Sequence, residues 1–171
     1  MKKIMSNIEM KSVIQDISAR IKKEIGLKEI VIVGIRRRGA ILADRIKKFL
    51  PENVPVGYLD ITFYRDDFST VGAHPVVSET DVLFNIDNKK VLLVDDVLFT
   101  GRTIRAALDA LVDLGRPSLV KLFVLIDRGH RELPISADYV GKTIKTKKNE
   151  MVEVKVKEID GVDEVVVVER R

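Results

Sequence analysis

The sequence lacks cysteine and tryptophan altogether, and its 171 residues include only two histidines. Without cysteine the chain has no disulfides, no thiol nucleophile and no cysteine-bound zinc. His74 and His130 leave too few imidazoles for a histidine-rich metal site. His74 lies in a polar segment, and we interpret it as an ordinary loop residue rather than a catalytic one.

Long hydrophobic runs are missing as well. None approaches the roughly 20 residues that cross a bilayer. The first twelve residues, MKKIMSNIEMKS, contain two early lysines but no continuous apolar stretch, which is unlike a secretory signal. We therefore expect a cytoplasmic protein that does not bind membranes.

Hydrophobic side chains make up 46% of the chain and charged ones 33%. This composition predicts a soluble globular protein, and the length suits one domain over residues 1–171. Its net charge of +4 is unevenly spread. Residues 1–23 and 128–148 each carry a balance of +4, which leaves −4 for the rest. These basic segments indicate either an anionic macromolecular partner or solvated surface lysines.

Hydrophobic periodicity predicts strands that alternate with helices. Helices are expected at 6–25, 39–50 and 102–114, and strands at 29–34, 56–64, 91–94 and 119–126, followed by two more strands within 151–169. Such alternation predicts an α/β fold with a mainly parallel, twisted sheet flanked by helices. Ligands bind such sheets beyond the carboxyl ends of the strands. Residues 65–81 show no periodicity and are expected to form a long loop.

Two adjacent carboxylates follow the predicted strand in VLLVDDVLFTGRT, residues 91–103. Asp95 and Asp96 repel each other and are costly to bury unless a cation meets them. The next turn, Thr100-Gly-Arg-Thr, combines a glycine, two hydroxyls and a helix N-terminus, which together favour an anion. A glycine turn alone is weak evidence, since most such turns only connect elements. Beside the acid pair it predicts a phosphate site, with ribose hydroxyls or a phosphate-borne Mg²⁺ on the carboxylates.

The run of apolar residues, Asp-Asp and Thr-Gly-Arg-Thr closely resembles the phosphoribosyl-pyrophosphate signature of type I phosphoribosyltransferases. The resemblance implies a Mg²⁺-dependent enzyme, with the acid pair on the ribose and the metal. It also implies that the turn GIRRRG, residues 34–39, faces the leaving diphosphate, and that the loop after residue 64 closes over the substrate. The implied substrate site is Arg36, Arg38, Gly39, Arg65, Asp95, Asp96, Val97, Leu98, Phe99, Thr100, Gly101, Arg102 and Thr103. Of these, Asp95, Asp96, Arg36 and Arg38 are the expected catalytic residues.

Further segments narrow the resemblance to a family of pyrimidine-operon regulators that are also uracil phosphoribosyltransferases. These segments are DITFYRDD, DALVDLGRP, DRGHRELPI and ADYVGK. The resemblance implies a core at about 27–126 and a hood at about 127–150 with the terminal segments. In that hood Tyr139 would stack on the base and Val140 would read its edge, although Tyr139 also suits a buried core position. Phe99 stands where purine-using relatives commonly have an aspartate, which favours uracil.

The same resemblance implies binding to leader mRNA of a pyrimidine operon, promoted by UMP or UTP, to attenuate transcription. The basic segments supply the candidates for RNA contacts, Arg20, Lys22, Lys23, Arg131 and Lys142. A homodimer would join two such patches. Since the chain has no RNA-recognition motif, the alternative is a phosphoribosyltransferase for another nucleobase without an RNA-binding role.

Overall fold

The computed structural model describes residues 1–66 and 80–170. In chain order its elements are β1 (Lys2–Met5), α1 (Asn7–Glu24), β2 (Ile30–Ile35), α2 (Arg38–Lys47), β3 (Val56–Leu59), the 3-10 helix η1 (Thr62–Tyr64), β4 (Lys90–Leu98), α3 (Arg102–Leu114), β5 (Leu119–Asp127), β6 (Tyr139–Thr143), β7 (Glu150–Lys155), α4 (Lys157–Asp160) and β8 (Glu164–Glu169). His74 lies outside the described residues. Within them, no helix is long and apolar enough to cross a membrane.

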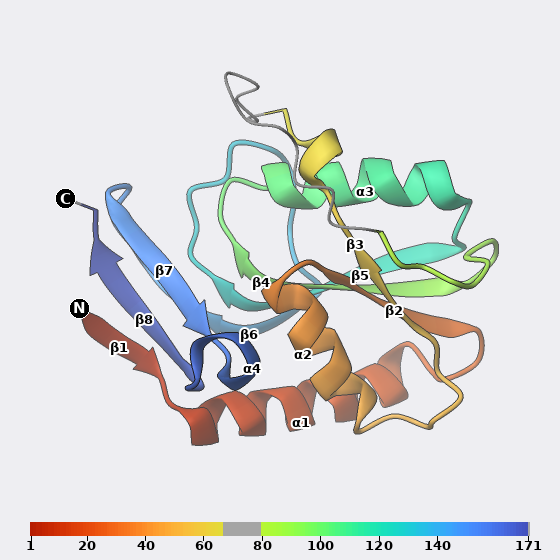
Figure 1. Cartoon of the computed structure of the whole chain (residues 1–171), viewed down its shortest axis with the longest axis horizontal. Helices are drawn as coiled ribbons and strands as arrows, with labels where there is room; N and C mark the ends of the chain where they lie inside the picture. The colour runs from red at the N-terminus through yellow and green to blue at the C-terminus, as the bar shows by residue number, and fades with distance from the viewer. Residues whose placement is uncertain (67–79, 171) are drawn as a thin grey trace.

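Five strands form a fully parallel sheet in the order β3-β2-β4-β5-β6. Helix α3 covers one face, and α1 and α2 cover the other (Figure 1). Each face buries its own apolar core, one with α3 and one with α1 and α2. The predicted α/β class with a parallel sheet is therefore confirmed.

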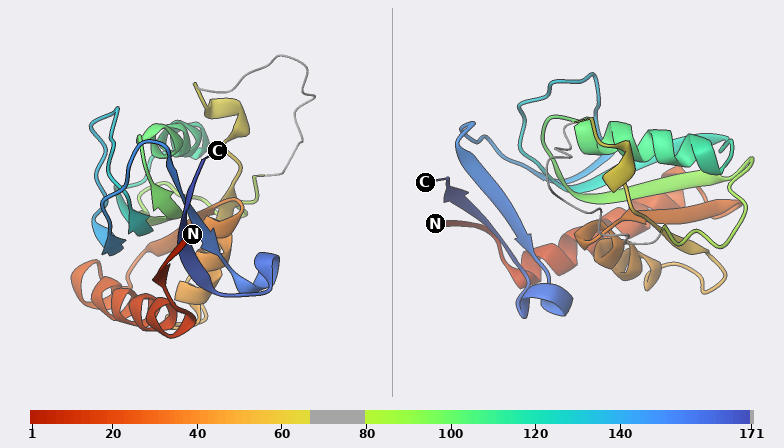
Figure 2. Two further views of the ribbon diagram at one scale, coloured as in Figure 1. Left: turned by 90° about the vertical axis from the view of Figure 1, so that its left-hand side faces the viewer. Right: turned by 45° about the horizontal axis from the view of Figure 1, so that its top comes forward.

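Three antiparallel strands form a second sheet in the order β1-β8-β7, so that both ends of the chain contribute to it. This sheet and α4 stand to one side of the main sheet (Figures 1 and 2), where β7 contacts β4. We call β1, β7, α4 and β8 together the hood.

The expected hood combined residues of about 127–150 with the terminal segments, and these two parts lie in different places. Within residues 127–150, Tyr139–Thr143 forms β6 and pairs with β5 at the edge of the main sheet. Helix α1 packs so closely on this strand that a Cβ on Gly141 would lie 2.8 Å from Val13 Cγ1. Tyr139–Thr143 therefore belongs to the main sheet, whereas the terminal segments form the hood.

The strand expected at 56–64 ends early, at Leu59. The Asp60 carboxylate accepts hydrogen bonds from the Thr62 backbone N–H at 2.9 Å and its hydroxyl at 2.7 Å. This local turn competes with the sheet ladder, and the chain continues as η1. As a result Phe63, which would share one strand face with Leu59 and Ile61, is instead 66% exposed.

Candidate active site at the carboxyl edge of the sheet

The acid pair lies in the last part of β4, which continues to Leu98, so the acids lie within the strand rather than after it. Asp95 is buried, and its carboxylate accepts a hydrogen bond of 2.9 Å from the Asp96 backbone N–H. Burial, followed by the neighbouring charge of Asp96, raises the pKa of Asp95 well above its usual value. Burial likewise raises the pKa of Asp96. Arg65 and Arg38 offset these effects only in part, so the pair favours a further positive charge beside it.

Oxygen ligands of this kind suit Mg²⁺, which binds one or two carboxylates and takes its other ligands from substrate and water. Among residues 1–66 and 80–170, no group of three His, Cys, Asp or Glu side chains could hold a metal by itself. Asp95 and Asp96 thus fit a magnesium ion that is shared with a phosphorylated substrate. They do not form a closed protein cage.

Two glycines, Gly34 and Gly39, allow the turn between β2 and α2 to lie close to the acid pair. We call this turn, residues 34–39, the arginine turn. A Cβ on Gly39 would lie 2.6 Å from the Val94 carbonyl oxygen and 3.1 Å from Asp95 Cα. A Cβ on Gly34 would lie 2.7 Å from Ala40 Cα. Only residues without a side chain allow this approach, and it brings the N-terminus of α2 beside the carboxylate pair.

The three arginines of this turn have different environments. Arg37 is exposed, whereas Arg36 and Arg38 are half-buried. The Arg36 guanidinium lies over the ring of Tyr58, 5.2 Å from its centroid. Arg38 donates a hydrogen bond of 2.9 Å to Asp160 in the hood, and its charge opposes the effect of burial on the pKa of Asp96.

The turn between β4 and α3 has the backbone geometry of an anion site. Gly101 caps α3 with a φ of +92°, a left-handed conformation that glycine adopts without strain. Thr100 accepts a hydrogen bond from Arg102 N through its hydroxyl, and its carbonyl accepts one from Glu132 N at 2.9 Å. A cleft of about 420 Å³ opens here, lined by Arg65, residues 97–104, Glu132 and Arg170.

This cleft brings together all seven substrate-site residues predicted after the acid pair, residues 97–103, and it adds Ile104, Glu132 and Arg170. The Arg102 side chain, however, turns away to pair with Asp66 at 2.6 Å and with Glu132 at 3.1 Å. The backbone N–H of Arg102 therefore hydrogen-bonds within the turn, while its guanidinium links the turn to Asp66 and Glu132.

Phe99 lies at the start of the turn between β4 and α3, which we call the phosphate turn because a phosphate is predicted to bind there. Its ring contacts a buried cation that the sequence analysis did not identify as a site residue. Arg128 is 4% exposed, and its guanidinium lies 3.9 Å from the ring centroid of Phe99. Burial lowers the pKa of Arg128. His130 contacts the same ring edge-on, and its Nε2 lies 2.6 Å from the Thr146 carbonyl oxygen. His130 thus contributes to the packing around Phe99.

Arg131 was predicted to contact RNA, but its guanidinium is engaged inside the molecule. It donates to the Phe99 carbonyl at 2.9 Å, to the Ile135 carbonyl at 2.8 Å and to the Asp127 carboxylate at 2.6 Å. These three bonds tie the phosphate turn to the end of β5. Arg131 is therefore a positioning residue for the turn.

We expect Arg131→Lys to lower catalytic efficiency about tenfold, because a lysine ammonium cannot reproduce a planar fork with three partners. Steady-state kinetics would measure the effect, with Arg105→Lys on the exposed side of α3 as the matched control. If the kinetics were unchanged and RNA binding were weaker, Arg131 would instead be an RNA-contacting residue, as first predicted.

Tyr139 is not brought to this site. It begins β6, pairs with Phe123 in the register and is 4% exposed. Its ring lies 5.0 Å from the Arg20 guanidinium, and burial, with a hydrogen bond to Glu24, raises the pKa of Tyr139 to about 12. Val140 pairs with Val124, which in turn pairs with Asp95, so Val140 lies level with the acid pair two strands away. The interpretation of Tyr139 as a core residue fits these contacts, and stacking on a base does not.

The other four candidates for RNA contacts lie on two adjoining elements. Arg20, Lys22 and Lys23 lie in the last turns of α1, and Lys142 lies on β6, against which α1 packs. All four residues are exposed. Lys142 also donates a hydrogen bond of 2.8 Å to the Ile4 carbonyl. Lys142 thus reaches the start of α1, whereas Arg20, Lys22 and Lys23 lie in its last turns; we call these three residues the α1 basic surface.

Residues 1–159 match the family model described as "Phosphoribosyl transferase domain". The chain belongs to the phosphoribosyltransferase family. It is 57% identical over 153 residues to the bifunctional protein PyrR of Pelotomaculum thermopropionicum. The aligned segment covers 87% of this chain and 84% of that relative. It is 51% identical to the PyrR of Caldicellulosiruptor bescii over 171 residues, or 97% and 94% of the two chains. Within the phosphoribosyltransferases it is thus a member of the PyrR family.

The fold has a close counterpart in a hypoxanthine phosphoribosyltransferase from Staphylococcus aureus. The TM-score is 0.74, with 96% of this chain and 90% of that chain covered. At 20% identity this likeness shows the fold alone. The predicted family, fold class and enzyme type are therefore confirmed for this phosphoribosyltransferase.

Proposed function

We propose that this PyrR-family chain transfers ribose 5-phosphate from phosphoribosyl pyrophosphate to uracil, giving UMP and diphosphate. The observation that carries the proposal is the pair of buried Asp95 and half-buried Asp96, which lies between the two glycine-containing turns. Burial raises the pKa of both carboxyls, so the site favours positive charge next to them. A substrate with a phosphate at one end, a diphosphate at the other and a cationic sugar between them matches that arrangement.

Each part of the substrate has a defined place in this proposal. The 5′-phosphate binds in the 420 Å³ cleft, where it accepts hydrogen bonds from the backbone of residues 100–103 and from the Thr100 and Thr103 hydroxyls. Asp95 and Asp96 hold the ribose hydroxyls. Arg36, Arg38 and Arg65, with the backbone at Gly39, face the diphosphate. Magnesium shared between the acid pair and the substrate would neutralise the leaving diphosphate.

The reaction breaks the bond between C1′ and the diphosphate oxygen and forms a bond between C1′ and a uracil ring nitrogen. The proton on that nitrogen leaves to solvent or to the diphosphate. The sugar becomes cationic in between, and the carboxylates of Asp95 and Asp96 stabilise that charge electrostatically. Holding both reactants in line supplies much of the acceleration, since the effective molarity of well-oriented reactants lowers the barrier by about 7–11 kcal/mol.

Phe99 supports uracil as the base. Its phenyl ring exchanges no proton, and Arg128 holds it in place from below. A purine enzyme with an acid at this position can protonate the base, whereas uracil has a ring N–H that is acidic enough to need less help. Parallel assays with uracil, hypoxanthine, guanine and orotate test this choice. We expect turnover with uracil; efficient use of hypoxanthine or guanine instead would contradict it.

The second proposed role is uridine-nucleotide-dependent binding to pyrimidine-operon leader mRNA, which attenuates transcription. Two observations support it: the relatives are named bifunctional, and three exposed cations form the α1 basic surface. A homodimer, or a higher oligomer, would present two such surfaces to one RNA. Since the substrates and nascent mRNA are cytoplasmic, residues 1–171 would act in the cytoplasm as one phosphoribosyltransferase unit.

Filter binding to a leader hairpin tests this role. We expect UMP to increase affinity, and affinity to fall steeply with salt because phosphate contacts release counterions. Replacing Lys22 and Lys23 by glutamine should reduce the salt slope by about one per lost contact, with Lys48→Gln at the C-cap of α2 as the control. Affinity that is independent of nucleotide would leave the chain an enzyme only.

A further inference from the structure

A second cleft, of about 340 Å³, lies between the arginine turn, the acid pair and the hood. It is lined by Arg38, Asp96, residues 152–155 and Asp160. Its lining includes two cations, Arg38 and Lys155, and three carboxylates, those of Asp96, Glu153 and Asp160. If the proposed function holds, the diphosphate enters here. A cleft richer in carboxylates than in cations disfavours a polyanion unless one of its internal pairs opens.

The two cations of this cleft are already engaged. Lys155 pairs with Glu164 at 3.2 Å. Arg38 Nη2 donates to Asp160 Oδ1 at 2.9 Å, and the two side chains are 33% and 20% exposed. The other oxygen of Asp160 accepts a hydrogen bond of 2.8 Å from Val156 N. This backbone bond and the Arg38 bond lower the pKa of Asp160, so its carboxylate is charged at neutral pH.

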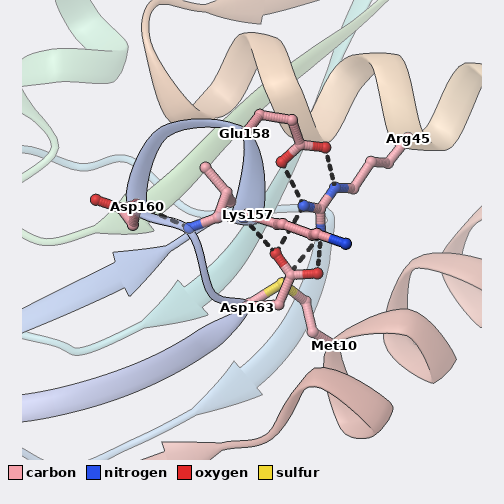
Figure 3. A network of polar contacts seen from close by, with 7 residues as sticks. Met10, Arg45, Lys157, Glu158, Asp160 and Asp163 are labelled. Carbon is pink, nitrogen blue, oxygen red and sulfur yellow. Dashed lines mark hydrogen bonds and ion pairs between the residues drawn. The ribbon is translucent and has the colours of Figure 1, made fainter.

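Arg45 anchors the same part of the hood independently (Figure 3). Its guanidinium donates to Glu158 at 2.6 Å and to both oxygens of Asp163, at 2.7 and 3.1 Å. Asp163 also accepts a hydrogen bond from the Lys157 backbone at 2.7 Å. The hood is therefore fastened to α2 through two carboxylates at Arg45.

Arg38 and Arg45 are seven residues apart in α2, almost two full turns, so they project from the same face of the helix. They differ in how firmly they are held. Arg45 has two carboxylate partners and is 15% exposed, whereas Arg38 has one hydrogen bond to a single carboxylate, and its buried Nε has no hydrogen-bond partner among the described residues. The Arg38 pair can open while the Arg45 anchor keeps the hood in place.

We propose that the Asp160 carboxylate competes with the diphosphate for Arg38. It binds the Arg38 guanidinium in the ligand-free enzyme, and this ion pair breaks when a diphosphate-bearing ligand enters the cleft. This inference rests on the proposed function. Asp160 acts through Arg38 and is a positioning residue. By competing for the guanidinium, it keeps the affinity for free diphosphate low, which assists product release.

Isothermal titration of the full chain with magnesium diphosphate tests this role. We expect Asp160→Asn to bind diphosphate threefold to tenfold more tightly than the wild type, because the amide still accepts the Val156 N–H but no longer competes as an anion. In steady-state assays the KM for phosphoribosyl pyrophosphate should fall and kcat should fall or stay equal. Asp160→Glu, which retains the charge, should remain within twofold of the wild type.

Two further variants separate this role from a general loosening of the hood. Glu158→Gln weakens the Arg45 anchor without touching Arg38, and it should leave diphosphate affinity within twofold of the wild type. Arg38→Ala should abolish the effect of Asp160→Asn in the double variant. Equal tightening by Glu158→Gln, or unchanged or weaker binding in Asp160→Asn, would overturn the inference. A wild-type chain that binds no diphosphate at all would instead overturn the proposed function.

Discussion

Asp96→Asn is expected to lower the rate of phosphoribosyl transfer by about 10²–10³-fold while the protein still folds. Asparagine keeps the shape of the side chain and an oxygen that accepts the Val97 N–H, which Asp96 binds at 2.8 Å. It removes the charge that stabilises the cationic sugar, and a single electrostatic contact to a transition state is worth about 2.7–4 kcal/mol. Steady-state kinetics with uracil and phosphoribosyl pyrophosphate measure the loss, and a fully active variant would contradict the assignment.

The same variant should be more stable than the wild type at neutral pH, by about 1–2 kcal/mol, as for other relieved charge repulsions. Burial raises the pKa of Asp95 and Asp96 above the ordinary carboxyl value of 3.8. The folded state therefore holds these protons more tightly than the unfolded chain does. The protonated acid pair stabilises the fold at a pH below the ordinary carboxyl pKa. This contribution is lost as the pH rises through the higher pKa that the pair has in the folded protein.

Urea unfolding at several pH values checks the sign. The stability advantage of Asp96→Asn should be absent at a pH below the ordinary carboxyl value, should grow over the window above it, and should then stay constant. Taking the difference between the two proteins cancels the other carboxylates, such as Asp163, which pair with Arg45 and titrate in both. An advantage that shrinks as the pH rises would show that the pair is stabilising when charged.

Gly39→Ala is expected to destabilise the protein by about 1–3 kcal/mol and to abolish most of its activity. Gly39 lies in α2, where alanine by itself favours the helix by about 1 kcal/mol. Its Cβ, however, would lie 2.6 Å from the Val94 carbonyl oxygen, and overpacking of this kind forces backbone shifts. The helix must then move away from β4, which carries Arg38 away from the acid pair.

Gly129→Ala is the control for this variant. Gly129 has a φ of +76° and no atom within 4 Å of an added Cβ, so alanine there meets backbone strain of about 1 kcal/mol without a clash. Chemical denaturation and steady-state kinetics on both variants separate the two effects. A Gly39→Ala protein that is more stable than the wild type and fully active would show that α2 does not need this close approach to β4.

The main features of the site could be predicted from short segments. Ser6 and Glu9 have the spacing of a capping box, which predicts the start of a helix, and both hydrogen bonds of that box are present at the start of α1. The acid pair and the Thr-Gly-Arg-Thr turn identified the carboxyl edge of β4. These features are local, because a strand, its turn and the next helix start are specified by neighbours along the chain.

Periodicity and turn residues act over a few positions, and for that reason the parallel α/β fold and the position of the acid pair could be predicted from the sequence alone. Tertiary structure alone decided which side chains meet there. It assigned Tyr139 to the core, because pairing of β6 with β5 places that residue on α1, and it turned Arg131 inward onto the phosphate turn. It also placed Asp160 on Arg38, although 122 positions separate them. Long-range pairs of this kind depend on how the termini fold back over the sheet, and no local pattern encodes that return.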